Sequence, residues 1–361
     1  MTQILIIGAG LNGLSCAYAA WKQGHQVTVI EQFSLGHTLG SSHGESRIIR
    51  YSYDSPEYVR LAKRAYALWQ ELEDHLGMQV LHLGGGIDIA PAEHPLLKKH
   101  MAALDAEQIP HELLSAAAAM ERFPQFHIPE NEAVLYQKDA GILKPDDLLP
   151  ALAGFLREQG VSIQENTPVL EIDHGKVVTE RWTYTPDQVL VCAGAWMNAL
   201  LPSPLPLQAT QEQVSYHAAP DSRFHFPAMP VVIDLVRGPY GFPQLGKPGV
   251  KFGLHHQGPE VTPQTRTFEP NPALLQKMGH WLETFMPEVS PEPSEVVTCL
   301  YTSTPDENFV IDRVTPKTTV VSACSGHGFK FGPATGELAL QRAFQESNAF
   351  PEFFLADFQQ E

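Results

Sequence analysis

The chain is poor in cysteine and lacks any long apolar run. Its 361 residues include four scattered cysteines and no CxxC pair, so neither a disulfide scaffold nor a zinc ribbon is expected to hold the fold together. No stretch approaches the ~18 to 20 apolar residues of a membrane-spanning helix. The sixteen histidines form no HExxH arrangement. We therefore expect no membrane span and no metal centre.

Basic residues are also scarce. The chain has 24 Lys and Arg against 41 Asp and Glu, a net charge of −17, which disfavours nucleic acid or an anionic membrane surface as a partner. With 43% hydrophobic and 18% charged residues, the composition is that of a soluble globular protein large enough for two lobes. No signal-like segment precedes the first strand pattern, so we expect a cytoplasmic location.

The beginning of the chain predicts a nucleotide-binding βαβ unit. A β-branched run over 2–7 leads through Gly8-Ala9-Gly10-Leu11-Asn12-Gly13 into a helical pattern over 14–22, and a second buried strand over 25–31 follows. In such a unit the phosphate anion lies at the free N–H groups that open the helix. The order and spacing of these three elements are much more specific than an isolated glycine motif.

Each glycine of this motif meets a different structural requirement. Gly8 allows a tight exit from the strand, Gly10 lets the backbone approach a pyrophosphate, and Gly13 lets the helix pack against the sheet. Glu31 ends the second strand, where it can accept hydrogen bonds from a ribose diol and would repel a 2′-phosphate. The unit therefore disfavours NADP but leaves NAD and FAD both open.

Three cations stand among apolar neighbours. Arg47 and Arg50 are either two solvated side chains or a pair held beside a buried anion, since Arg offers fixed bidentate donors for a carboxylate. Lys251 occupies an alternating position in a strand pattern. It lies either on a solvated face or inward, where it needs a nearby anion or a perturbed pKa.

The rest of the chain predicts a discontinuous α/β architecture. Helices are expected over 57–76, 94–107, 113–121 and 146–160. An apolar strand over 188–192 runs into Ala193-Gly194-Ala195-Trp196, which is either a second close approach to the nucleotide or an ordinary small-residue turn. Residues 205–298 are rich in proline and alternating strands and predict an antiparallel second domain. The last sixty residues return to a strand, a glycine-rich turn and a helix.

Five separated motifs together resemble the monomeric sarcosine oxidase and N-methyltryptophan oxidase family. They are Gly40 to Arg50, Tyr240-Gly241-Phe242-Pro243, Lys251, Cys299-Leu300-Tyr301 with Thr304-Pro305-Asp306-Glu307, and Ser325 to Phe331. The resemblance covers essentially the whole chain. It implies FAD in place of NAD, a glutathione-reductase-type Rossmann-like FAD domain, and an α+β substrate domain with an antiparallel sheet, as in D-amino-acid oxidase.

The resemblance also implies roles for individual residues. Cys299 matches the cysteine that carries the flavin covalently, Arg50 and Lys330 match the pair that holds the substrate carboxylate, and Lys251 matches the lysine associated with oxygen reduction. The implied catalytic or pocket residues are Lys251, Arg47, Arg50, Lys330, His255, Tyr240, Tyr301 and His327. The implied cofactor contacts are Gly8, Gly10, Leu11, Asn12, Gly13, Glu31, Gln32, Ser41, Ser42, Arg47, Ile48, Val169, Ala193, Gly194, Trp196, Cys299, Gly326, Gly328, Phe329 and Lys330.

The chain departs from the family pattern at Ser42, Ser46 and Tyr51, and in Gly332 to Thr335. None of these changes removes a catalytic group, but they leave the substrate side chain open. We expect a monomer that oxidises a small secondary amino acid such as sarcosine with O2, giving H2O2. The alternatives are an oxidase or dehydrogenase of primary or cyclic amino acids, a flavin-binding subunit without turnover, and a NAD-linked dehydrogenase.

The expected domains are discontinuous. An FAD domain takes residues 1–85, 140–205 and 299–361, and a substrate domain takes 86–139 and 206–298. The FAD domain therefore begins and ends the chain, while most of the substrate domain lies between.

Overall fold

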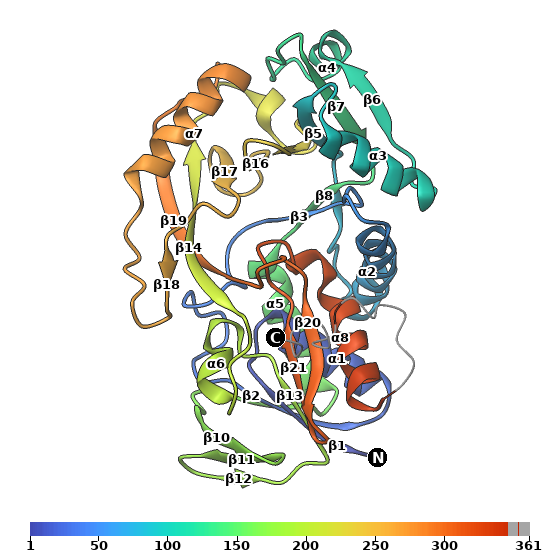
Figure 1. Cartoon of the computed structure of the whole chain (residues 1–361), viewed down its shortest axis with the longest axis vertical. Helices are drawn as coiled ribbons and strands as arrows, with labels where there is room; N and C mark the ends of the chain where they lie inside the picture. The colour runs from blue at the N-terminus through green and yellow to red at the C-terminus, as the bar shows by residue number, and fades with distance from the viewer. Residues whose placement is uncertain (346–352, 354–361) are drawn as a thin grey trace.

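The computed structural model describes residues 1–345 and 353, which form two stacked parts in Figure 1. A sheet with helices against it makes the lower part, and a larger sheet with α4 and α7 packed into one common core makes the upper part. The remaining residues of the expected FAD domain, 346–352 and 354–361, lie outside the described residues.

The lower part contains a six-stranded, mostly parallel sheet in the order β20-β21-β13-β1-β2-β9. Strands β1, β2, β9, β13 and β21 run parallel, and β20 pairs antiparallel with β21 at one edge. The strands are β1 (Gln3–Ile7), β2 (Gln26–Ile30), β9 (Ser162–Gln164), β13 (Gln188–Val191), β20 (Val310–Thr315) and β21 (Thr318–Ser322). This arrangement confirms the expected βαβ opening and the return of the chain to the same sheet at its far end.

The side chains of β1 show that this sheet is buried on both faces. Ile4 and Ile6 belong to a core that includes α1, α5 and α8, whereas Leu5 and Ile7 face a second core with a small antiparallel sheet. An apolar residue at every position suits a parallel strand that is covered on both sides. The small sheet consists of β10 (Val169–Asp173), β11 (Lys176–Thr179) and β12 (Thr183–Tyr184).

The upper part is built on a nine-stranded sheet, in which the long strands β14 and β19 pair along ten register positions. All its pairs are antiparallel except β15 with β5, so the expected antiparallel sheet is in fact mixed. The strands are β5 (Gly86–Pro91), β6 (Glu112–Ser115), β7 (Glu132–Gln137), β14 (Gln208–His217), β15 (Val231–Asp234), β16 (Pro239–Phe242), β17 (Val250–Leu254), β18 (Glu260–Val261) and β19 (Pro293–Ser303).

One face of this large sheet packs on an apolar core, and the other turns toward the lower part. In β17, Val250, Phe252 and Leu254 enter the core, so Lys251 between them points to the opposite face. In β5, Ile87 and Ile89 enter the same core, which places Asp88 on the face of Lys251. Because apolar and charged residues alternate along these two strands, Lys251 and Asp88 both lie buried on the inner face of the sheet.

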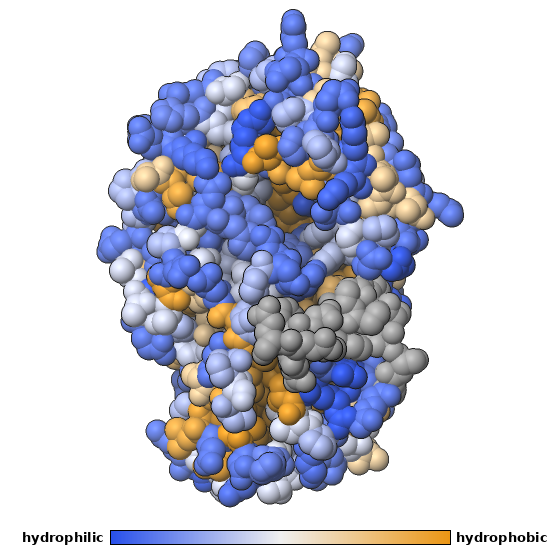
Figure 2. Space-filling model, viewed as in Figure 1, coloured by the Kyte–Doolittle hydropathy of each residue, from blue (hydrophilic) through white to orange (hydrophobic). Residues whose placement is uncertain are grey.

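The helices and a second small sheet complete the fold. The helices are α1 (Leu11–Lys22), α2 (Pro56–Leu76), α3 (Pro95–Ala106), α4 (Ala116–Arg122), α5 (Pro145–Glu158), α6 (Met197–Leu200), α7 (Pro272–Phe285) and α8 (Gly332–Ala343). This second small sheet consists of β3 (Arg47–Ile49), β8 (Gly141–Leu143) and β4 (His82–Leu83). Figure 2 shows a surface that is hydrophilic over most of this face.

Two sequence expectations need correction. The helix expected over 113–121 begins only at Ala116, because Glu112–Ser115 form β6 and pair with β7. The domain boundary expected at residue 299 falls inside β19, which stays paired with β14 to Ser303. With that boundary moved, the strand content of the two large sheets supports the discontinuous two-domain division, which we retain as a proposal.

Candidate active site

A single cavity of about 1830 Å³ collects the candidate residues. Every residue expected to contact cofactor or substrate lines it, with the exception of Gly13. The lining comes from both large sheets and from the loop over 31–46. A space of this size exceeds an ordinary small-molecule pocket of roughly 300 to 1000 Å³, so it can hold a large ligand together with a second molecule.

The glycine turn after β1 leaves no room for side chains. Gly8 has φ +99°, and a Cβ there would lie 2.4 Å from the Cys192 carbonyl oxygen. A Cβ on Gly13 would lie 1.8 Å from the Gly8 carbonyl oxygen, which is the close packing of helix on strand that the sequence predicts. Ser42 Oγ accepts a hydrogen bond from the Leu11 amide at 3.1 Å, and so joins the following loop to the helix start.

Glu31 lies at the end of β2 and is buried within the cavity wall. Its carboxylate accepts hydrogen bonds from the amides of Ala9, at 2.7 Å, and Phe33, at 3.0 Å. These two bonds fix the orientation of a group with four acceptor positions. The remaining acceptor capacity is available to a ribose.

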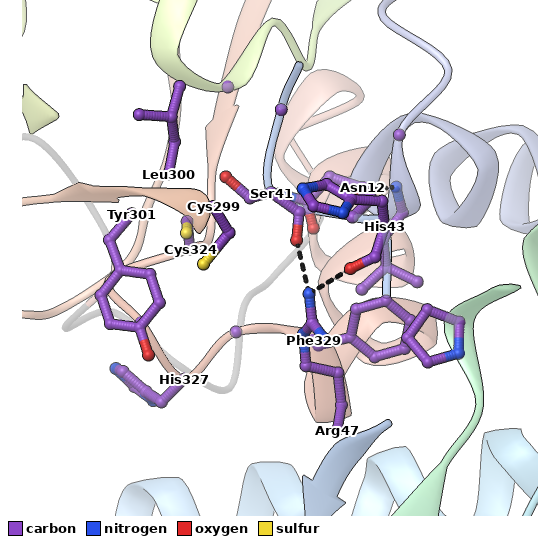
Figure 3. A pocket seen from close by; sticks show the side chains of 18 of the residues that line it. Asn12, Ser41, His43, Arg47, Cys299, Leu300, Tyr301, Cys324, His327 and Phe329 are labelled. Carbon is purple, nitrogen blue, oxygen red and sulfur yellow. Dashed lines mark hydrogen bonds between the residues drawn. The ribbon is translucent and has the colours of Figure 1, made fainter. Parts of the chain in front are cut away.

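Arg47 and Cys299 lie on opposite sides of one section of the cavity, as Figure 3 shows. Arg47 is held by the carbonyl oxygens of Ser41, His43 and Ser46 and lies over the ring of Phe329. Burial raises the pKa of the Cys299 thiol to about 11, although the positive charge of Arg47 opposes this shift. The thiol belongs to β19, so its position is set by the large sheet.

Lys251 takes the inward orientation. Only 3% of the residue is exposed, and its Nζ donates to the carbonyl oxygen and the Oγ of Ser46, at 2.9 and 3.0 Å. Burial, reinforced by the charge of Arg47, lowers the pKa of Lys251 to about 7. A lysine that changes its charge near neutral pH is unusual and is typical of functional sites.

Arg50 lies beside a buried anion, and that anion belongs to the protein. Its Nη1 donates to Asp88 Oδ1 at 2.8 Å, which joins the chain after β3 to the inner face of β5. No described residue accepts a hydrogen bond from Nε or Nη2 of Arg50, and neither atom is among the buried unpaired atoms of the described chain. These N–H groups are therefore available to a ligand in the cavity.

Lys330 is held in a short hydrogen-bond chain with Tyr53 and His327. Its Nζ donates to the Tyr53 hydroxyl at 2.8 Å and to the His327 carbonyl oxygen at 2.7 Å. Burial lowers the pKa of His327 to about 3, so the imidazole is neutral. Its Nε2 lies 3.1 Å from the Glu307 carbonyl oxygen and must carry the proton, so Nδ1 accepts from the Tyr53 hydroxyl.

The chain brings Lys330 and Arg50 to the same aromatic ring. Lys330 Nζ and the Arg50 guanidinium lie 5.4 and 5.3 Å from the centre of the Tyr53 ring. Burial and the charge of Arg50 hold the pKa of Lys330 well below its usual range. Two cations that disfavour each other in one cavity are suited to an anionic ligand between them.

The other predicted pocket residues form one aromatic corner. The hydroxyl oxygens of Tyr240 and Tyr301 are 3.3 Å apart, and a Cβ on Gly326 would meet the Tyr301 ring at 2.4 Å. Burial holds the pKa of His255 well below its usual value. Metal-ligating atoms of His255, His256 and Glu307 lie within 4.8 Å of one another, the one such group found among the described residues.

Sequence reasoning missed Tyr53, Asp88 and Cys324. Tyr53 and Cys324 line the cavity, and Asp88 lies behind Arg50. Cys324 directs its sulfur toward the same space as Cys299 (Figure 3). Tyr53 lies three residues after Arg50, and Asp88 interrupts an apolar alternation, so both carried a local signal, but the partners Lys330 and Arg50 are remote in sequence.

No helix among residues 1–345 has both the length and the apolar character needed to cross a bilayer.

Comparisons with known proteins show the family of the chain. Residues 3–342 match the family model described as FAD dependent oxidoreductase. The chain is 32% identical to the peroxisomal sarcosine oxidase of Homo sapiens, over 98% of this chain and 94% of that protein. It is 33% identical to the N-methyl-L-tryptophan oxidase of Yersinia pestis, over 93% of each.

Solved structures show the same fold at lower identity. The L-proline dehydrogenase from P. horikoshii superposes with a TM-score of 0.87 at 22% identity and covers 99% of this chain and 98% of its own. The glycine oxidase from Geobacillus kaustophilus superposes with a TM-score of 0.79 at 19% identity, over 99% of each. The chain therefore belongs to the family of FAD-dependent oxidoreductases and has the D-amino-acid-oxidase-like fold.

Proposed function

We propose that this protein oxidises a small secondary amino acid, such as an N-methyl amino acid, with O2 as the electron acceptor. The observation that carries the proposal is the convergence of Arg50, Lys330 and Lys251 on one cavity that also contains a dinucleotide cradle. Similarity to a sarcosine oxidase and an N-methyltryptophan oxidase supports the substrate class.

The residues of the cavity fit FAD. Gly8 keeps the tight exit from the strand, since a Cβ there would meet the Cys192 carbonyl oxygen, Gly10 lines the cavity where a pyrophosphate would approach, and Glu31 offers a carboxylate for the ribose. In the cavity wall, Nε2 of His43 is buried with no hydrogen-bond partner among the described residues. Cys299 and Lys251 lie where the large sheet meets the cavity. When bound, FAD supplies the acceptance of two electrons from substrate and their transfer to oxygen.

Arg50 and Lys330 hold the substrate carboxylate in this proposal. Arg50 offers the N–H groups that Asp88 leaves free, and Lys330 Nζ is held nearby by the Tyr53 hydroxyl. Since burial depresses the pKa of Lys330, an incoming carboxylate also favours proton uptake by this lysine. The two contacts fix the amino end of the substrate relative to the cofactor. The oxidised product is an imine, which water hydrolyses to an amine and an aldehyde.

Lys251 supplies a positive charge for oxygen reduction. Its ammonium is fixed by Ser46, so the charge is pre-positioned for an anion that develops when oxygen accepts electrons. Hydrogen peroxide is the expected product. We also propose that Cys299 carries the FAD covalently and that the protein acts as a monomer, as the name of its relative from Bacillus, monomeric sarcosine oxidase, suggests.

A peroxide-coupled screen of purified holoenzyme tests the proposal. It compares sarcosine and N-methyltryptophan with proline, pipecolate and unmethylated amino acids. Peroxide formation from the N-methyl compounds supports the proposal. Turnover with an artificial acceptor but without peroxide indicates the dehydrogenase alternative. Absence of turnover with every compound supports a flavin-binding subunit, and absence of a flavin spectrum refutes the cofactor assignment.

A further inference from the structure

Asp88 is a buried acid on the inner face of the large sheet, directly behind Arg50. Only 4% of the residue is exposed, and burial raises the pKa of its carboxyl group while the Arg50 guanidinium opposes this shift. The register of the large sheet places Asp88 beside Ile233, and Ile233 beside Tyr240. The three residues therefore form one row on the inner face, which we call the floor. Ile233 and Tyr240 of this row line the cavity, and Asp88 lies behind Arg50.

The contacts of Asp88 make it a partner of Arg50. Oδ1 accepts the hydrogen bond from Arg50 Nη1, and Oδ2 lies 3.9 Å from His100 Nδ1. Burial lowers the pKa of His100 to about 3, so the imidazole is neutral and Arg50 is the cation that balances Asp88. His100 Nδ1 is 2.7 Å from Ser52 Oγ, which gives the ring its own partner.

The charges around the floor therefore nearly cancel before any ligand arrives. Arg50 and Asp88 neutralise each other, His100 and His327 are uncharged, and Lys330 is the one remaining amine of this group. The cavity lining also includes the carboxylates of Asp54, Glu57, Asp306 and Glu307. One negative charge on a ligand is matched by Lys330. Among the described residues that contact Arg50 or Asp88, a second charge meets no further unpaired cation, because Arg47 and Lys251 are held at Ser46 in another section of the cavity.

We propose that Asp88 acts through Arg50 as the charge filter of the substrate cavity, so that monocarboxylic amino acids are accepted and dicarboxylic ones are rejected. This inference rests on the proposed carboxylate site and narrows its substrate class. Asp88 is a specificity-determining residue in this account. It contacts Arg50 and lies behind that side chain, away from the ligand.

Equilibrium dialysis of radiolabelled acetate and malonate against the holoenzyme tests the filter without turnover. The wild-type protein is expected to bind acetate more tightly than malonate. Asp88→Asn keeps the shape of the side chain and an acceptor for Arg50 but removes the charge. It should strengthen acetate binding by about tenfold and malonate binding by several times more, because the same change in potential acts on two negative charges in a dianion.

Asp105→Asn is the matched control. Asp105 lies on α3 with 73% of its side chain exposed and does not line the cavity. The substitution therefore makes the same change in net charge at a position that solvent screens. It should leave both affinities unchanged. An unchanged malonate-to-acetate ratio in Asp88→Asn, or wild-type protein that binds neither anion, overturns the proposal.

A rescue experiment separates a charge role from a structural role. Arg50→Gln leaves Asp88 without its cation and should weaken acetate binding by at least about 100-fold. The double variant Arg50→Gln with Asp88→Asn should recover part of that loss, because it removes both charges. A double variant no better than Arg50→Gln, or failure of both Asp88 variants to fold, overturns the proposal. Loss of amine turnover with these affinities intact would instead refute the proposed function alone.

Discussion

Replacing Lys251 with methionine should slow the reaction with oxygen and spare the reaction with substrate. The lysine is 3% exposed, and its pKa of about 7 against an ordinary 10.5 corresponds to about 5 kcal/mol against the charged form. A methionine fills similar space without charge. Since the proposed substrate contacts, Arg50 and Lys330, lie elsewhere in the cavity, we expect the rate of FAD reduction by substrate to change by no more than about threefold, and the rate of reoxidation to fall roughly 100-fold.

Stopped-flow absorbance measures the two half-reactions separately. The protein is reduced anaerobically, by substrate or by dithionite, and then mixed with oxygenated buffer, so the test does not depend on the identity of the substrate. Lys176→Met, which changes an exposed lysine of β11, is the control. Reoxidation of Lys251→Met at the wild-type rate would remove this lysine from the mechanism.

The same pKa gives two dependences on pH. In the cofactor-free protein Lys251 is protonated below about pH 7, whereas in the unfolded chain it stays protonated to 10.5. The unfolded state therefore binds more protons between these values, and the cost of the buried lysine is full below pH 7 and disappears as pH rises to 10.5. Lys251→Met should stabilise the cofactor-free protein most below pH 7. In the holoenzyme, wild-type reoxidation should slow as rising pH deprotonates the lysine.

Three further substitutions test other parts of the site. Cys299→Ala should release its FAD on acid precipitation, whereas the wild-type precipitate stays yellow. Gly13→Ala should lower both FAD content and the unfolding midpoint, because its Cβ would lie 1.8 Å from the Gly8 carbonyl oxygen. Tyr53→Phe removes one of two acceptors of Lys330 and should raise KM for a carboxylate substrate by about tenfold, with a smaller effect on kcat.

Two control variants and one kinetic criterion distinguish specific effects from general damage in these tests. Cys324→Ala removes the neighbouring thiol of the same cavity and should keep the FAD attached, so release from this variant would contradict the assignment to Cys299. Gly154→Ala, where a Cβ meets nothing within 4 Å, should be tolerated in α5. An equal fall in kcat and kcat/KM for Tyr53→Phe would show that its hydroxyl acts beyond carboxylate binding.

The sequence was informative where structure is local. The strand, glycine turn and helix of the opening unit are contiguous, so spacing alone predicts them. The segment over 113–121 shows the limit, since Leu113 and Leu114 are compatible with a helix but form β6 because β7 offers a pairing partner. Local propensity cannot anticipate a partner twenty residues away.

The sequence also does not predict which face of a strand is buried. The alternation around Lys251 and Asp88 predicts strands but does not tell which face is solvated. Burial of both residues depends on the lower part, which covers the inner face, and the partner of Asp88 is 38 residues earlier in the chain. The family resemblance drew attention to Lys251, but it gave no reason to expect Asp88.

The position of Cys299 on β19 has a mechanical consequence. The dinucleotide cradle belongs to the parallel sheet, whereas the thiol belongs to the large mixed sheet. A cofactor bonded to this sulfur would act as a brace between the two halves of the molecule. Opening by rotation of one half against the other would then strain the cofactor itself, so substrate exchange is left to the rim of the cavity.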